Sequence, residues 1–159
     1  MTAASNKTRS VVFVCHGNIC RSPMAERVAE GWAQRHGITD VIFSSAATSR
    51  EEIGHGIDPR ASKVLAAHGY RIGGHRAHQI TSDEIEAAAL VAVMERHQLE
   101  HLRRLAPEAD NLAMLTRFDP DAAPWAPIDD PWYGGPAGFE DTLTVIEACV
   151  PGLMDWLAG

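Results

Sequence analysis

The sequence predicts a single-domain α/β protein with a four-stranded parallel sheet and helices on both faces. Short apolar runs alternate with helix-like segments along the whole chain, and no internal repeat or low-complexity linker interrupts them. The length of 159 residues suits one domain, and 45% hydrophobic residues are enough to bury a core. We expect a flexible N-terminal segment over residues 1–9 and the folded domain over residues 10–159.

The strands are predicted from short, mostly apolar runs, which suit burial on both faces of a sheet. A stretch with helical character separates each run from the next or follows it, as in a series of parallel strand–helix–strand units. The predicted strands cover Val11–Val14, Val41–Ser44, Leu90–Met94 and Asn111–Leu115.

The helices are predicted from apolar residues at helical spacing with start and stop signals at their ends. Ser22-Pro23 is typical of an N-cap followed by the first helical residue, and Asp58-Pro59 has the same pattern. The predicted helices cover residues 22–37, 59–69, 81–86, 98–105 and 139–157, the last with a bend at Pro151-Gly152, whereas the proline-rich residues 118–138 are mostly loop.

The net charge and the distribution of apolar residues argue against several classes of protein. The 21 acidic and 14 basic residues leave a formal net charge of −7, which argues against a nucleic-acid-binding protein. No apolar stretch approaches the roughly 18 residues that a membrane span needs. The polar N-terminus is not followed by the apolar block of a signal peptide. We expect a soluble, cytoplasmic monomer that binds neither nucleic acid nor membrane.

The chain has three cysteines, Cys15, Cys20 and Cys149. An odd number does not resemble the disulfide framework of a small secreted protein, and a reducing cytosol fits best. Cys15 and Cys20 are not spaced like a zinc half-site, and no second cluster of Cys or His accompanies them. We expect no metal site, and we place Cys149 in the core.

The segment after the first predicted strand is the candidate site, because α/β sheets bind ligands at the carboxyl ends of their strands. Glycine and asparagine tolerate left-handed backbone, so this loop can curl until its amides surround one anion. The N-terminal end of the following helix adds positive potential at the same point. The predicted anion-binding loop comprises His16, Gly17, Asn18, Ile19, Cys20 and Arg21.

Two side chains that frame this loop predict its chemistry. Arg21 can bind two oxygens of a tetrahedral dianion bidentately. Cys15 lies in the same positive environment, which favours its thiolate and makes it a candidate nucleophile. The alternative is that Cys15 is only a small core residue at a strand end and Arg21 only a surface charge. The strand before the loop and the helix after it favour the functional interpretation.

Residues 14–26, Val-Cys-His-Gly-Asn-Ile-Cys-Arg-Ser-Pro-Met-Ala-Glu, resemble the phosphate-binding loop of the low-molecular-weight protein tyrosine phosphatases. The likeness extends over nearly the whole chain, through residues 45–49, 58–61, 75–80 and 130–134. It implies a bacterial-type enzyme that hydrolyses phosphotyrosine monoesters in protein substrates through a phosphocysteine intermediate. It also implies that the enzyme uses no metal and no organic cofactor.

The resemblance assigns the catalytic roles. Cys15 is the expected nucleophile, and Arg21 is the expected clamp on the phosphate. The family carries its general acid on the aspartate directly before a proline, which in Asp129-Asp130-Pro131 is Asp130. Asp130 would protonate the leaving phenolate and later take a proton from water. Asp129 is then a solvated neighbour.

Supporting roles follow from the same resemblance. The Ser22 hydroxyl is expected to donate to the Cys15 thiolate, a role compatible with N-capping the helix. Asn18 and His75 resemble a family pair in which Asn18 holds the loop open and His75 orients it. Cys20 corresponds to a second loop cysteine that forms a reversible disulfide with the nucleophile under oxidation.

The chain departs from the family at the mouth of the expected pocket. Glu51 lies in a stretch where the family usually places an aromatic residue, and Trp132 and Tyr133 stand where the family usually has two tyrosines. His16 occupies a variable position at the entrance. We expect these residues to set specificity, with Glu51 disfavouring substrates that carry acidic residues beside the phosphotyrosine.

A second departure lies outside the mouth. His78 replaces a usual arginine and Glu95 a usual aspartate. The sequence suggests that these two replacements compensate each other, a longer acid for a shorter base.

Three alternative functions fit the sequence less well. Arsenate reductases on a similar scaffold use two further cysteines near the middle of the chain, and residues 80–110 contain none. Protein-arginine phosphatases tend to carry threonine where this loop has Ile19. A catalytically idle phosphopeptide-binding module would not need Asp130.

Overall fold

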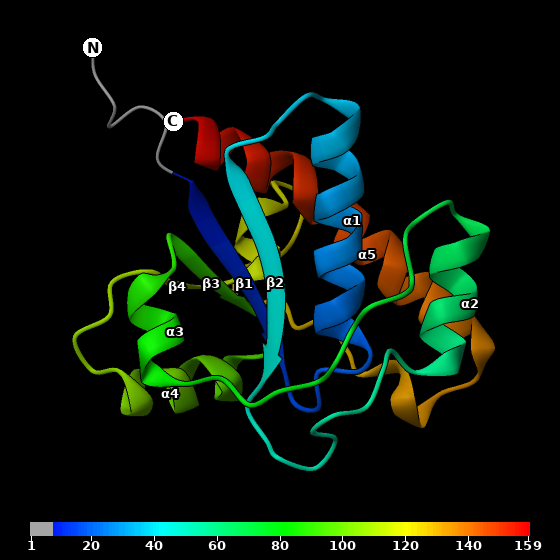
Figure 1. The fold of residues 1–159 in the computed structure, drawn as a ribbon, viewed down its shortest axis with the longest axis horizontal. Helices are drawn as coiled ribbons and strands as arrows, with labels where there is room; N and C mark the ends of the chain where they lie inside the picture. Colours follow the sequence, from blue (N-terminus) through cyan, green and yellow to red (C-terminus); the bar gives the residue numbers. More distant parts are fainter. Residues whose placement is uncertain (1–7) are drawn as a thin grey trace.

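The fold is built on a parallel sheet whose strands are connected through helices (Figure 1). The computed structural model describes residues 8–159. All three strand pairs are parallel, and the strand order is β2-β1-β3-β4. The elements are β1 (Arg9–Cys15), α1 (Arg21–Arg35), β2 (Val41–Ala47), α2 (Pro59–Ala67), α3 (Ser82–Ala87), β3 (Leu90–Val93), α4 (Arg96–Leu105), β4 (Leu112–Met114), the 3₁₀ turns η2 (Leu115–Phe118) and η3 (Pro131–Tyr133), and α5 (Pro136–Ala158).

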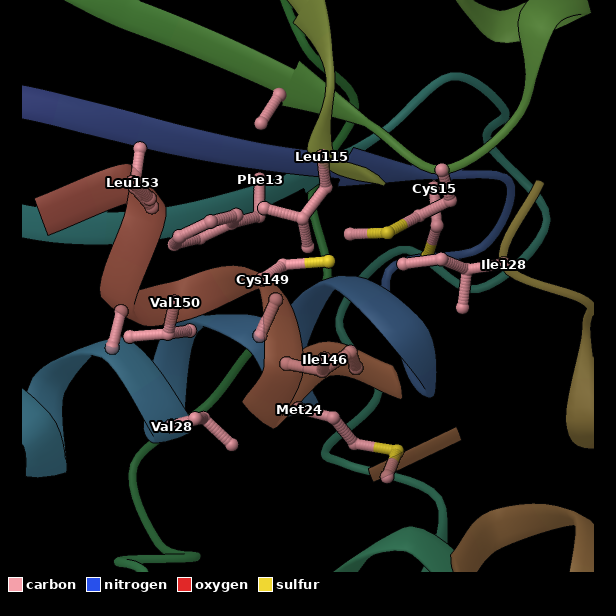
Figure 2. Packing of buried hydrophobic residues seen from close by; sticks show 14 of the residues in the cluster. Phe13, Cys15, Met24, Val28, Leu115, Ile128, Ile146, Cys149, Val150 and Leu153 are labelled. Carbon is pink, nitrogen blue, oxygen red and sulfur yellow. The ribbon is translucent and has the colours of Figure 1, made fainter. Parts of the chain in front are cut away.

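Two apolar clusters, one on each face of the sheet, form the core. The larger cluster joins β1 to α1, α2 and α5, and Figure 2 shows Phe13, Met24 and Cys149 within it. The smaller cluster packs Val12 and Val14 of β1 against apolar residues of α3 and α4. Successive residues of a strand point to opposite faces, so β1 contributes to both clusters. The predicted fold class, a four-stranded parallel sheet with helices on both faces, is confirmed.

The four predicted strands are present, and most helix boundaries agree with the prediction within a few residues. The predicted cap of α2 is confirmed, because the Asp58 carboxylate accepts a hydrogen bond from the Arg60 amide at 2.8 Å. Thr81 caps α3 by accepting from the Glu84 amide at 3.1 Å. The prediction for α1 was wrong at its start: the helix begins at Arg21, and Ser22 makes no cap.

The two ends of the domain also differ from expectation. Residues 1–7 of the expected flexible segment lie outside the described residues, and strand β1 already begins at Arg9. Helix α5 begins at Pro136, three residues before the predicted start, and runs through Pro151 to Ala158. Within residues 8–159, none of the helices combines the length and the apolar character needed to cross a bilayer.

Helix α5 approaches the chain after β4 closely at Gly152. A Cβ atom built on Gly152 would lie 1.9 Å from the backbone oxygen of Phe118, the last residue of η2. No side chain fits at that separation, so glycine is required for close backbone packing. This contact holds α5 against the segment that leads into the 119–135 loop.

We predict that Gly152→Ala lowers the free energy of unfolding by roughly 1–3 kcal/mol, the usual range for forcing extra atoms into a packed core. Urea unfolding followed by circular dichroism measures the change. Gly138→Ala, in the same helix, is the matched control, because its Cβ would meet only Pro131 at 3.8 Å. This control should leave stability unchanged or raise it, since alanine is the better helix former. Equal stability of the two variants would contradict the prediction.

Candidate active site

A cavity of about 130 Å³ opens at the carboxyl ends of the strands. Its walls come from the loop after β1, from the loop after β2 and from the segment around η3. It brings together residues that are up to 118 positions apart in the sequence. The lining residues are Cys15, His16, Gly17, Ile19, Cys20, Arg21, Glu51, Glu52, Asp130, Trp132 and Tyr133.

Cys15 ends β1, and the residue is 2% exposed. Its Sγ lies 3.1 Å from the Ser22 Oγ, and the Ser22 amide donates to it at 3.4 Å. The Ser22 hydroxyl therefore turns back into the loop instead of capping α1. A hydroxyl has one proton, so Ser22 can donate it to a thiolate at Sγ or accept from a neutral thiol there.

Asn18 holds the loop after β1 in shape. It is fully buried and adopts a left-handed conformation with φ of 62°. Its Nδ2 donates to the Ser22 Oγ at 2.8 Å, and its Oδ1 accepts from the His78 amide at 3.1 Å. The Asn18 side chain thus ties the loop both to the start of α1 and to the segment before α3.

His75 contacts the backbone of the same loop and is not among the residues that line the cavity. Its Nε2 lies 2.7 Å from the backbone oxygen of Asn18. A carbonyl oxygen only accepts hydrogen bonds, so this Nε2 carries the proton. Burial lowers the pKa of His75 below its usual value. At neutral pH a neutral imidazole with its proton on Nε2 therefore donates to the backbone of the loop.

Arg21 is the buried cation of the site, with a side chain only 3% exposed. Its Nη1 donates to the Ile128 carbonyl at 2.8 Å and lies 2.9 Å from the Glu95 carboxylate. Its Nη2 lies 3.6 Å from the Asp130 carboxylate. These partners hold the guanidinium at one side of the cavity.

Asp130 reaches the cavity and Asp129 does not. Asp130 precedes η3, and its Oδ1 accepts from the Trp132 amide at 3.0 Å, which fixes the carboxyl group at the start of the turn. Asp129 is exposed and is not among the residues that line the cavity. The structure therefore places the carboxyl group before Pro131, and not its neighbour, beside Arg21 and Cys15.

The mouth of the cavity is acidic on one side and aromatic on the other. Glu51 pairs with His16 at 3.1 Å, and its side chain is 69% exposed. Glu52, which the sequence analysis did not single out, also lines the cavity and pairs with His55. Trp132 and Tyr133 form the opposite side and are both exposed. Negative charge therefore surrounds one half of the entrance.

Comparison with known proteins identifies the family. Residues 10–158 match the family model described as low molecular weight phosphotyrosine protein phosphatase. The chain belongs to this family.

The relatives of this phosphatase-family chain span most of its length. It is 42% identical over 149 residues to low molecular weight protein-tyrosine phosphatase A of Mycobacterium tuberculosis, an alignment that covers 92% of this chain and 90% of the relative. It is 40% identical to a low molecular weight protein-tyrosine-phosphatase of Streptomyces coelicolor, with 92% of each chain covered. A protein tyrosine phosphatase structure from Entamoeba histolytica superposes with a TM-score of 0.89 at 28% identity, covering 95% of this chain and 97% of the other.

Gly17 has a different role in this phosphatase-family loop from the predicted one. Asn18 has the left-handed conformation, whereas Gly17 is not among the glycines with positive φ. A Cβ on Gly17 would lie 3.4 Å from the Glu52 Cγ. Glycine at this position therefore leaves room at the mouth, and the freedom to curl comes from asparagine alone.

The predicted compensation between His78 and Glu95 is also wrong. The His78 ring pairs with Glu84 at 2.8 Å, whereas Glu95 pairs with Arg21 and His97. Glu95 lies two residues after the end of β3, separated from it by Met94. Its side chain therefore reaches the site from the carboxyl end of that strand. Sequence analysis missed its contact with Arg21, and its position just after a predicted strand was the available signal.

The three cysteines are free and buried. Burial raises the pKa of the Cys20 thiol, and the negative charges of Asp58, Cys15 and Asp130 raise it further. Burial raises the pKa of Cys149 to about 12, and this residue lies in the core as predicted. The disulfide between Cys15 and Cys20 stays a prediction. In the described part of the chain, no three His, Cys, Asp or Glu side chains are grouped closely enough to hold a metal ion.

Glu95 should contribute stability that depends on pH. Burial raises the pKa of its carboxyl group, but Arg21 and His97 lower it more, so the folded pKa lies below the usual value of 4.5. This contribution is present above the unfolded pKa and is lost as pH falls through the folded pKa. We predict that Glu95→Gln lowers the free energy of unfolding by roughly 1–3 kcal/mol at pH 7, and by less at pH 3.

Urea unfolding at both pH values tests this prediction. Glu100→Gln is the matched control on α4, because Glu100 forms only an exposed pair with Arg96 at 3.9 Å. The control should change stability by less than about 0.5 kcal/mol. A Glu95→Gln effect that is equal at pH 3 and pH 7 would show that the carboxylate charge makes no contribution.

Proposed function

We propose that this member of the family is a hydrolase that removes phosphate from phosphotyrosine in proteins through a phosphocysteine intermediate. One observation carries the proposal: a single cavity is lined by Cys15, Arg21 and Asp130. A nucleophile, a cation and a proton donor are the three groups that in-line phosphoryl transfer from an aryl ester requires. Their convergence from distant parts of the chain supports an enzyme over a phosphopeptide-binding module.

In the first step the Cys15 thiolate attacks phosphorus, and the S–P bond forms as the bond from phosphorus to the tyrosyl oxygen breaks. Asp130 gives its proton to the departing oxygen, so that tyrosine leaves as the neutral phenol. The Arg21 guanidinium and the amides of residues 16–21 stabilise the charge on the equatorial oxygens. All the groups required come from this chain.

In the second step water attacks the phosphocysteine. The Asp130 carboxylate takes a proton from the water, the new P–O bond forms, and the S–P bond breaks. The leaving group is the Cys15 thiolate, which accepts hydrogen bonds from the Ser22 amide and hydroxyl. The Ser22 contacts at 3.4 and 3.1 Å support this role, because both groups already face Sγ.

The walls of the cavity favour an aryl ester with few acidic neighbours. Ile19 and Trp132 supply apolar surface on which a phenyl ring can pack. Glu51 and Glu52 repel carboxylates beside the phosphotyrosine, whereas neutral or basic neighbours meet no like charge. His16 belongs to this selection because it pairs with Glu51 at the entrance. Tyr133, 87% exposed, is placed to contact the peptide outside the cavity.

We predict that the native protein hydrolyses para-nitrophenyl phosphate and phosphotyrosine peptides, and that Cys15→Ser abolishes both activities. Asp130→Asn should lower kcat/KM for phosphotyrosine peptides by about 10²- to 10⁴-fold, the usual contribution of a general acid. Asp129→Asn is the matched control and should leave the rate nearly unchanged. Steady-state release of phosphate measures all four proteins.

Four outcomes would overturn parts of the proposal. No turnover by the native protein would exclude the phosphatase function. Turnover by Cys15→Ser would exclude the covalent step. Equal losses in Asp129→Asn and Asp130→Asn would exclude Asp130 as the acid. Equal rates on phosphoserine, phosphoarginine and phosphotyrosine peptides would exclude the specificity for phosphotyrosine.

We predict that Glu51→Gln raises kcat/KM about twofold to fivefold for peptides with Asp or Glu beside the phosphotyrosine, the range that an exposed charge pair supports. Peptides with neutral neighbours should change little. The difference should shrink at high salt, because exposed charges are screened. Glu86→Gln on α3, exposed and outside the cavity, is the control. The same gain for neutral and acidic peptides would contradict an electrostatic origin.

A further inference from the structure

Arg60 of α2 connects η3, which follows the expected general acid Asp130, to Asp58 at the start of α2. Its Nε and Nη2 donate to the two carboxylate oxygens of Asp58 at 3.1 and 3.0 Å. Its Nη1 donates to the Trp132 carbonyl at 3.4 Å. The guanidinium carbon lies 4.9 Å from the centre of the Trp132 ring and 4.7 Å from that of Phe139. The planar guanidinium of Arg60 therefore contacts Asp58 at the start of α2, Trp132 of η3 and Phe139 of α5.

The Asp58 end of this connection is firmly held. Asp58 is buried, and its amide donates to the Ile19 carbonyl at 2.8 Å, which joins α2 to the loop after β1. Burial raises the pKa of the Asp58 carboxyl group, but the hydrogen bonds and charge of Arg60 lower it more. The negative charge of Asp58 therefore offsets the positive charge of Arg60. Arg60 acts on the cavity mainly through the side chains that it holds in place.

Trp132, the other contact of Arg60, is hydrogen-bonded to Asp130. The Trp132 amide donates to the Asp130 Oδ1 at 3.0 Å, and both residues belong to the short turn η3 and its start. That turn has three residues, and Pro131 is buried whereas Trp132 and Tyr133 are exposed. A guanidinium that stacks on the Trp132 ring and binds its carbonyl restrains the residue whose amide fixes the carboxyl group of Asp130.

We propose that Arg60 is a positioning residue for the general acid: it holds Trp132, and through Trp132 it holds the Asp130 carboxyl group at the leaving oxygen. The proposal rests on the proposed phosphatase function. It requires the planar guanidinium, because the ammonium of a lysine cannot stack between two rings while it bridges both oxygens of Asp58.

The test compares aryl phosphates whose leaving groups differ in their need for a proton. Dinitrophenyl phosphate expels its phenolate without protonation, whereas phenyl phosphate depends on the acid. The ratio kcat/KM is the right quantity, because it covers the steps through departure of the leaving group. The variants are Arg60→Ala and Arg60→Lys, with Lys63→Ala as the control that removes an exposed positive charge from the same helix.

We expect both Arg60 variants to lose about tenfold or more in kcat/KM on phenyl phosphate, as small misplacements of a catalytic group do. Activity on dinitrophenyl phosphate should stay close to that of the native protein. Lys63→Ala should match the native protein on both substrates. Thermal unfolding identifies any loss of folded protein, and such a loss would lower both rates equally.

A double-mutant cycle with Asp130→Asn isolates the route of the effect. If Arg60 acts through Asp130, then Arg60→Ala causes no further loss on phenyl phosphate once Asp130 is replaced. Additive losses would overturn the proposal, and so would an equal loss on both substrates or full activity of Arg60→Lys.

These outcomes are distinct from failure of the proposed function. If the native protein hydrolyses neither aryl phosphate, the phosphatase function fails. If Asp130→Asn shows the leaving-group dependence and the Arg60 variants do not, only the role of Arg60 fails.

Discussion

The burial of one positive charge organises the site. A guanidinium taken out of water costs several kcal/mol unless it is paired and hydrogen-bonded, and the Arg21 side chain is 3% exposed. Its partners are the carboxylate of Glu95, which follows β3, the Ile128 carbonyl, and the carboxylate of Asp130. Two remote segments, the one after β3 and the 119–135 loop, must therefore converge on the start of α1. Because β1 lies between β2 and β3, this convergence occurs at the centre of the sheet edge.

The sequence predicted those parts of the site that are encoded by neighbours in the chain. Cys15 and Arg21 flank one contiguous loop, and Asp130 is marked by the proline after it. Glu52 and the contact of Glu95 with Arg21 were missed because they depend on side chains that meet across separate segments, which a single sequence does not reveal. Only the predicted helix cap of Ser22 was wrong, because its contacts with Cys15 and Asn18 outweigh its propensity to cap a helix.

The left-handed residue in the loop after β1 shows how local strain is offset. A non-glycine residue in this region costs of order 1–3 kcal/mol, and Asn18 adopts it with its side chain and backbone oxygen all hydrogen-bonded. The resemblance to the phosphatase family predicts that Asn18 and His75 act as a pair on this loop, and these roles stay a prediction. The structure shows the contacts involved: His75 donates to the Asn18 backbone oxygen, and the His78 amide donates to the Asn18 side chain. A loop restrained in this way is organised in advance for the charge stabilisation that the proposed function requires.

The first and last elements meet far from this loop. Arg9, at the start of β1, donates from its Nη1 to the Leu157 carbonyl near the end of α5 at 2.7 Å. Cys15 lies at the other end of the same strand, and seven residues of strand span about 20 Å. A new covalent link between the region of Arg9 and that of Leu157 would therefore leave the reactive edge of the sheet untouched. The domain is suited to circular permutation, with new ends opened in an exposed loop remote from the cavity.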